Sequence, residues 1–149
     1  TFPAEQGDEA DRRNLIVHRA LRSFTILNRF PYNNGHVMVV PRSHVSRLED
    51  LAAEDFADLQ AELRLAVGVV RSAYRPEGLN VGMNLGKVAG AGIEDHLHWH
   101  IVPRWGGDTN FMPVIADHRV MPQSLEDSYH ALLGAFSDGS PQPASTEQE

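Results

Sequence analysis

The longest regular pattern in the sequence is an apolar stripe over residues 53–75. Apolar side chains recur there at steps of three and four residues, the spacing of one helix face: Phe56, Leu59, Leu63, Val67, Val70 and Tyr74. Acidic residues near the start and arginines near the end suit the helix dipole, and Pro76 stops the helix. Because a helix with one apolar face must pack on another layer, this segment predicts a layered domain.

Short β-like runs surround this helix, over residues 15–18, 23–28, 36–40, 79–85 and 95–102. The segment between the second and third runs is rich in Pro, Asn and Gly, so those two runs predict an antiparallel hairpin. Residues 122–136 predict a final helix, with Ser124 as its N-cap and Asp127 as the capping-box partner. This order predicts an α+β fold, with an antiparallel sheet of about five strands, one long helix and one C-terminal helix.

The chain has 149 residues, which is the size of one domain. We expect a flexible lead-in over residues 1–13, a folded domain over 14–136 and a disordered tail over 137–149, where Ser, Pro, Gln and Glu dominate. The net charge is −7, and most of the excess acid lies in the two ends. An acidic chain with a near-neutral middle predicts no nucleic-acid partner.

The sequence has no cysteine, which excludes disulfides, a thiol nucleophile and a zinc site built on thiolates. Its apolar runs are too short to cross a membrane, and its first residues lack the apolar segment of a signal peptide. We therefore expect no membrane partner and a cytoplasmic location.

Three histidines alternate with apolar residues in one of the β-like runs. In a strand, His96, His98 and His100 share one face, while the residues between them face the core. A neutral imidazole is a nucleophile or a metal ligand, and a ring N–H can donate to a phosphate oxygen. The pattern thus favours phosphate chemistry or a three-histidine zinc site over a solvated strand face. His18, His118 and His130 lie outside the pattern and are expected to be surface or structural residues.

A glycine-rich loop over residues 84–92 precedes the histidines and contains Lys87. Such a loop can turn successive backbone N–H groups toward an anion. Together with three histidines, this loop favours phosphate chemistry over a bare metal site.

The run His96-Leu97-His98-Trp99-His100-Ile101-Val102 resembles the signature of the histidine triad superfamily of nucleotide hydrolases and transferases, in which histidines alternate with apolar residues. The stretch from Asn28 to Pro41 resembles the family's first motif block, and the long helix and glycine loop follow in the same order. His100 to Asp108 looks similar to the bacterial dinucleoside tetraphosphate phosphorylase and hydrolase branch. The likeness covers about residues 14–136.

The resemblance implies a role for each matching residue. His98 would attack the α-phosphorus and form a nucleotidyl-histidine intermediate, and His100 would hold phosphate oxygens and assist the leaving group. His96 would orient its neighbours, with help from His36. The remaining matches imply substrate binding: Asn28 for ribose, and Asn84, Gly90, Ala91 and Gly92 for phosphate.

The resemblance also implies a homodimer that binds an adenine nucleotide or a dinucleoside polyphosphate such as diadenosine tetraphosphate. It leaves open whether water or phosphate is the acceptor. The alternatives are a broad nucleoside phosphoramidate or nucleotidyl hydrolase, a nucleotide-binding regulatory module and a zinc hydrolase. Many relatives hold a structural zinc with two cysteines, whereas here only His44 and His96 match, so we predict no metal. The chemistry needs no cofactor, although Mg²⁺ can accompany the polyphosphate.

Overall fold

The computed structural model describes residues 7–91, 96–108 and 124–138. It contains one antiparallel sheet with strand order β1-β2-β3-β5-β4, which confirms the expected α+β class. The strands are β1 (Ile16–Arg19), β2 (Ser23–Leu27), β3 (Val37–Pro41), β4 (Gly78–Gly82) and β5 (Trp99–Arg104). The helices are α1 (Asp8–Asn14), α2 (Ala53–Tyr74) and α3 (Leu125–Ser137), with short 3₁₀ turns at Leu48–Asp50 and Lys87–Ala89.

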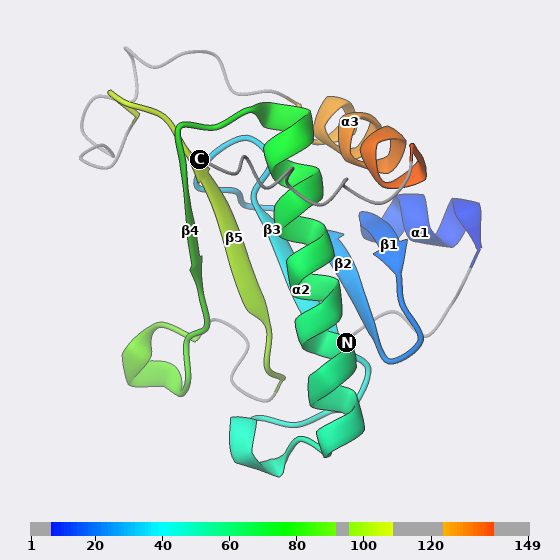
Figure 1. Ribbon diagram of the computed structural model, residues 1–149, viewed down its shortest axis with the longest axis vertical. Helices are drawn as coiled ribbons and strands as arrows, with labels where there is room; N and C mark the ends of the chain where they lie inside the picture. Colours follow the sequence, from blue (N-terminus) through cyan, green and yellow to red (C-terminus); the bar gives the residue numbers. More distant parts are fainter. Residues whose placement is uncertain (1–6, 92–95, 109–123, 139–149) are drawn as a thin grey trace, which may run out of the picture.

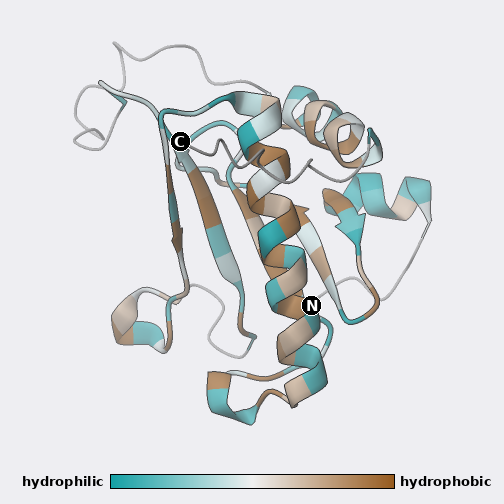
Figure 2. Cartoon of the chain, viewed as in Figure 1, coloured by the Kyte–Doolittle hydropathy of each residue, from teal (hydrophilic) through white to brown (hydrophobic). Residues whose placement is uncertain are grey.

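Helix α2 crosses one face of the sheet, and α3 lies beside it over the β1 edge (Figure 1). The main core fills the space between these helices and the strands beneath them, which carry much of the hydrophobic colour in Figure 2. A second, smaller cluster lies on the opposite face, where Ile16, Phe24 and Val40 pack together. Both faces of the central strands are therefore partly apolar.

The buried face of α2 confirms the expected stripe except at Phe56, since Leu59 and Val70 are buried and Leu63, Val67 and Tyr74 pack against the core. Phe56 is exposed, whereas Leu59, Ala66 and Val70 lie in the core together with the acidic Glu62. The Glu62 carboxylate accepts hydrogen bonds from the Thr25 hydroxyl at 2.6 Å and from Nδ1 of His18 at 2.8 Å. These two hydrogen bonds satisfy the carboxylate, as burial of a charged group requires.

The N-terminal residues from Asp8 onward also differ from the expected flexible lead-in, because they form α1. The Arg19 guanidinium of β1 holds this helix through Asp11, at 2.7 Å from Nη2 and 3.0 Å from Nε. At the other end of the chain, the Ser124 side chain accepts from the Asp127 amide at 3.1 Å, which confirms the expected N-cap of α3. Residues 139–149 of the expected tail lie outside the described residues.

Strand β5 continues through Pro103, where the sequence suggested an end at residue 102. Pro103 pairs with Leu79 of β4, although it has no N–H to donate. Its carbonyl points away from β4 and accepts from Nδ2 of Asn33 at 2.8 Å. The N and C=O of one antiparallel residue point the same way, so the missing N–H removes no bond to β4.

None of the helices within the described ranges is long and apolar enough to cross a membrane.

We predict that the pair of His18 and Glu62 makes the folding stability depend on pH. The hydrogen bond to Glu62 raises the pKa of His18, and its ring also stacks on Phe136 of α3 at 4.8 Å. A raised folded-state pKa contributes stability that is complete below the unfolded pKa of about 6.5 and is lost as the pH rises through the folded pKa. His18→Gln should therefore lower the free energy of unfolding by about 1–3 kcal/mol at pH 5.5 and by less at pH 9.

Urea denaturation at both pH values measures this difference. His130→Gln is the matched control, since His130 is an exposed histidine of α3 that lies 3.7 Å from Glu126. It should change the free energy of unfolding by less than about 0.5 kcal/mol. A loss at His18→Gln that is equal at both pH values would contradict the prediction.

Candidate active site

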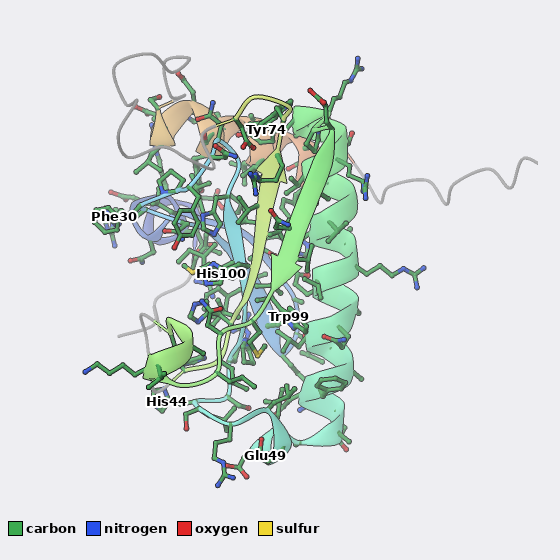
Figure 3. The ribbon with its side chains drawn as sticks, turned by 90° about the vertical axis from the view of Figure 1, so that its left-hand side faces the viewer. Phe30, His44, Glu49, Tyr74, Trp99 and His100 are labelled. Atoms are coloured by element: carbon green, nitrogen blue, oxygen red, sulfur yellow. The ribbon has the colours of Figure 1, made fainter. Side chains whose placement is uncertain are left out.

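The pairing of β3 with β5 places two histidines on the sheet face opposite α2. Met38 pairs with His100, and Val39 pairs with Trp99. Neighbouring strand residues point to opposite faces, so Trp99 lies toward α2 and His100 lies away from it (Figure 3). His36 immediately precedes β3 and is fully buried. Its Nε2 lies 2.9 Å from Nδ1 of His100.

The other two triad histidines do not lie on a strand, which corrects the expected continuous run from residue 95. β5 begins only at Trp99, because the segment before it turns toward the loop after β3. The Leu97 amide donates to the Val45 carbonyl at 2.8 Å, and Leu97 is buried as expected. His98 still reaches His100, with ring centroids 4.7 Å apart. His96 instead turns toward residues 41 and 44.

A backbone carbonyl determines which nitrogen of His98 carries the proton. Nδ1 of His98 lies 3.0 Å from the carbonyl oxygen of His96. A carbonyl only accepts, so Nδ1 must be the protonated nitrogen and Nε2 keeps its lone pair. Nε2 of His98 makes no hydrogen bond to any part of the chain that the structure describes. The His98 side chain is buried, with 6% of its surface exposed.

The same reasoning assigns the protons of His36 and His100. The Tyr32 amide donates to Nδ1 of His36 at 3.2 Å, so this nitrogen is unprotonated and Nε2 of His36 carries the proton. That proton is donated to Nδ1 of His100, which leaves the proton of the neutral His100 ring on Nε2. His100 therefore presents an N–H donor on Nε2, while the neighbouring His98 presents a lone pair on its own Nε2.

Burial keeps this pair of rings uncharged. Desolvation, together with the nearby His100 and His98, lowers the pKa of His36 to about 4. Desolvation, and to a lesser extent His98, also lowers the pKa of His100. Both rings are therefore neutral near pH 7, as the assigned tautomers require.

Gly35 is required where the chain enters β3. Its φ is +78°, a value that L side chains rarely adopt, and an added Cβ would lie 2.7 Å from Cε2 of Tyr74. The Tyr74 ring, at the end of α2, thus packs against the backbone that presents His36. The Gly-His pair of the sequence reflects this contact as well as the turn.

Asn28, the expected ribose ligand, lies at the start of the turn that leads to His36. Its Oδ1 accepts from the Phe30 amide at 2.9 Å, which closes an Asx turn. Its Nδ2 lies 3.4 Å from Nε2 of His36. The structure therefore brings Asn28 next to the histidines, with its amide N–H₂ directed at the site and its oxygen used locally.

The glycine loop is closed by its own hydrogen bonds. Nδ2 of Asn84 lies 3.4 Å from the Gly90 carbonyl. The amides of Gly90 and Ala91 donate to the carbonyls of Lys87 and Gly86, at 2.9 and 3.2 Å. These two N–H groups are thus already used, contrary to the expectation that they are available to phosphate. Gly92 lies outside the described residues.

His44 and His96 are close together but do not form a zinc site. Their Nδ1 atoms lie 3.0 Å apart, and Nε2 of His96 donates to the Pro41 carbonyl at 2.6 Å. No group of three or more His, Cys, Asp or Glu able to hold a metal occurs among the residues that the structure describes. Two imidazoles do not complete the four ligands of a structural zinc, so the residues in the described ranges do not fit this metal.

The groups that fix the proton positions were not visible in the sequence. They are the backbone N–H of Tyr32 and the backbone carbonyls of His96 and Pro41. Every residue type carries such groups, so no motif could have indicated them. The resemblance implied His36 and His44 as partners of His96. The structure places His44 beside His96 and pairs His36 with His100 instead.

The chain is similar to several proteins of one family. It is 46% identical over 123 residues to AP-4-A phosphorylase of Mycobacterium tuberculosis, which covers 83% of this chain and 63% of that protein. It is 38% identical over 93 residues to bis(5'-adenosyl)-triphosphatase of Dictyostelium discoideum, which covers 62% of each chain. The chain thus spans less than two thirds of the length of these relatives.

Solved structures show the same fold. The crystal structure of a hypothetical histidine triad nucleotide-binding protein from Sulfolobus tokodaii matches with a TM-score of 0.69 at 26% identity, over 83% of this chain and 84% of that one. A Zn-bound histidine triad family protein from Mycobacterium smegmatis matches with a TM-score of 0.66 at 24% identity, over 84% and 85%. The HIT domain family matches residues 10–107, and with the alternating histidines now located on and beside β5, the chain belongs to the HIT family.

Proposed function

We propose that this protein cleaves dinucleoside polyphosphates such as diadenosine tetraphosphate through a nucleotidyl intermediate on His98, with inorganic phosphate as the acceptor. The observation that carries the proposal is the pairing of a free Nε2 lone pair on His98 with an N–H donor on His100. The likeness to the mycobacterial phosphorylase supports phosphate rather than water as the acceptor.

In the first step, Nε2 of His98 attacks the α-phosphorus and the bond from that phosphorus to the bridging oxygen breaks. ATP then leaves from diadenosine tetraphosphate, and an adenylyl group stays on the ring. The ring becomes cationic, and its Nδ1–H bond to the His96 carbonyl at 3.0 Å stabilises that charge. Nε2–H of His100 donates to a phosphate oxygen and stabilises the charge that develops there.

In the second step, an oxygen of inorganic phosphate attacks the adenylyl phosphorus and the P–N bond breaks. The product is ADP, and His98 regains its lone pair. A terminal phosphate is a good leaving group, so neither step requires His100 to give up its proton. This matches the hydrogen-bonded pair of His36 and His100, whose rings stay neutral near pH 7.

Substrate binding is assigned to Asn28 and to the loop over residues 84–92. We propose that Nδ2 of Asn28 donates to a ribose hydroxyl, while Asn84, Gly90, Ala91 and Gly92 shape the loop around the phosphates. The internal bonds of Gly90 and Ala91 support a shaping role rather than direct donation. Mg²⁺ would accompany the polyphosphate. The cytoplasmic location stays a prediction from the sequence.

We also propose that two copies of the chain form a homodimer through β4. This strand is at one edge of the described sheet, where Val81 is 43% exposed. An uncovered edge offers unpaired backbone groups to a second copy, and antiparallel pairing about a two-fold axis would continue the sheet.

The reaction is tested by incubating the protein with diadenosine tetraphosphate, with and without phosphate, and separating the products by chromatography. We expect ADP and ATP in equal amounts when phosphate is present, because the adenylyl group passes to phosphate. AMP with ATP would instead indicate water as the acceptor, and binding without products would indicate a regulatory module.

His98→Ala is the matched variant for this assay. It should lower turnover by about 10⁴-fold or more, because the covalent step has no other nucleophile. Removal of zinc with a chelator, with Mg²⁺ restored in the assay, should leave turnover unchanged, since the described residues complete no zinc site. Undiminished turnover in His98→Ala, or activity restored by added zinc, would overturn the proposed mechanism.

The proton positions are tested by long-range ¹H–¹⁵N NMR of the histidine rings. At pH 7 the proton should lie on Nδ1 of His98 and on Nε2 of His36 and His100. On acidification, His36 should gain its second proton with a midpoint near pH 4, because burial and the neighbouring histidines disfavour its charged form. A proton on Nδ1 of His36, or a midpoint near 6.5, would contradict the assigned proton positions.

The dimer is tested by analytical ultracentrifugation. The wild type should sediment with twice the 16.5 kDa chain mass. Val81→Lys should give the mass of one chain, because a lysine at a sheet edge opposes pairing. Leu21→Lys is the control, since Leu21 is 81% exposed and lies between β1 and β2. A wild type that sediments as one chain would refute the dimer.

A further inference from the structure

The Asp108 carboxylate gathers donors from two parts of the chain. It accepts two bonds from the Arg104 guanidinium, from Nε at 2.6 Å and from Nη2 at 2.8 Å. It also accepts from the Trp105 amide and from Nδ2 of Asn33, each at 3.0 Å. The side chain is 10% exposed. A bidentate, charge-assisted pair of this kind holds its partners in one geometry.

One side of this cluster belongs to the ends of β4 and β5. Arg104 is the last residue of β5, and its Nη1 donates to Oδ1 of Asn80 in β4 at 2.6 Å. Asp108 follows in the loop after β5, where its own amide donates to the Trp105 carbonyl at 2.9 Å. The Asp108 carboxylate is thus held to β5 through Arg104, and Arg104 is held in turn by Asn80 of β4.

The other side of the cluster is the turn over residues 28–36. Nδ2 of Asn33 bonds to both Asp108 and the Pro103 carbonyl. The Asn33 carbonyl accepts from the His36 amide at 3.2 Å, and the Asn28 amide donates to the His36 carbonyl at 2.9 Å. The same turn carries the Tyr32 N–H that fixes the tautomer of His36. Asn33 therefore joins the carboxylate to the segment that orients His36.

We propose that Asp108 is a positioning residue, which acts through Asn33 to hold the turn over residues 28–36 so that the Tyr32 N–H keeps His36 in its Nε2–H tautomer. The proposal rests on the proposed function for its effect on turnover, while its effect on His36 stands without a substrate.

The hydrogen bond from the Tyr32 amide to Nδ1 of His36 is sensitive to small shifts of the turn. The Tyr32 nitrogen and Nδ1 of His36 are 3.2 Å apart, the long end of the range for N–H donors, so a shift of a few tenths of an ångström would break the bond. His36 could then place its proton on Nδ1 instead. Its Nε2 would then be an acceptor, and His100 would shift its own proton from Nε2 to Nδ1 to donate to it. His100 would be left without an N–H for the phosphate.

The experiment compares three variants. Asp108→Asn removes the charge at the cluster. Asn33→Ala removes the bonds of the turn to Asp108 and to the Pro103 carbonyl and leaves the pair of Arg104 and Asp108 in place. Asp11→Asn is the matched control, because Asp11 and Arg19 form a similarly buried bidentate pair between α1 and β1. Ring NMR without substrate and steady-state turnover of diadenosine tetraphosphate are measured for each protein.

We expect Asp108→Asn and Asn33→Ala each to show a population of His36 with the proton on Nδ1, and each to lower kcat by about 10- to 100-fold. The control should match the wild type in both measurements. An unchanged His36 spectrum in either variant would overturn the proposal, as would the same change in Asp11→Asn. If the wild type has no turnover, the proposed function fails, while the His36 spectra still decide the positioning role.

Discussion

The site depends on the hydrogen bond between His36 and His100. These residues are 64 positions apart in the chain, and their ring nitrogens lie 2.9 Å apart because β3 and β5 are neighbours in the sheet. Helix α2 packs on the other face of the same strands and keeps them in register. If this register slipped by one residue, His100 would move to the α2 face and the pair would be lost.

Backbone groups then give each ring a different chemical role. The Tyr32 amide and the His96 carbonyl place the protons of His36 and His98, while burial keeps His36 and His100 neutral. A lone pair and an N–H donor thus come from the same residue type, through different backbone hydrogen bonds. This arrangement is suited to a phosphorus centre, where one group attacks and another stabilises the oxygens.

Another polar pair lies on the sheet face that α2 covers. There His18 donates to the buried Glu62 and stacks on Phe136. The apolar stripe of α2 gave no sign of it, because hydrophobic spacing does not reveal which polar residue will find a partner across the core. The same spacing placed Phe56 inside, whereas its side chain is exposed. The burial of Glu62 depends on Thr25 and His18, which are distant in sequence and come together only when β1, β2 and α2 pack.

The sequence by itself determined the five strands, the two longer helices, the α+β class and the family, because alternation, helical spacing and the His-x-His-x-His motif are local patterns. It did not indicate α1. It also named His36, His98 and His100. The tertiary structure decided that β5 starts only at Trp99, that His96 faces His44 and Pro41, and that the amides of Gly90 and Ala91 are already bonded. Those outcomes depend on backbone hydrogen bonds between distant segments, and every residue type can make such bonds. Side-chain patterns therefore predict where the chain is buried, while chain packing decides which nitrogen holds the proton.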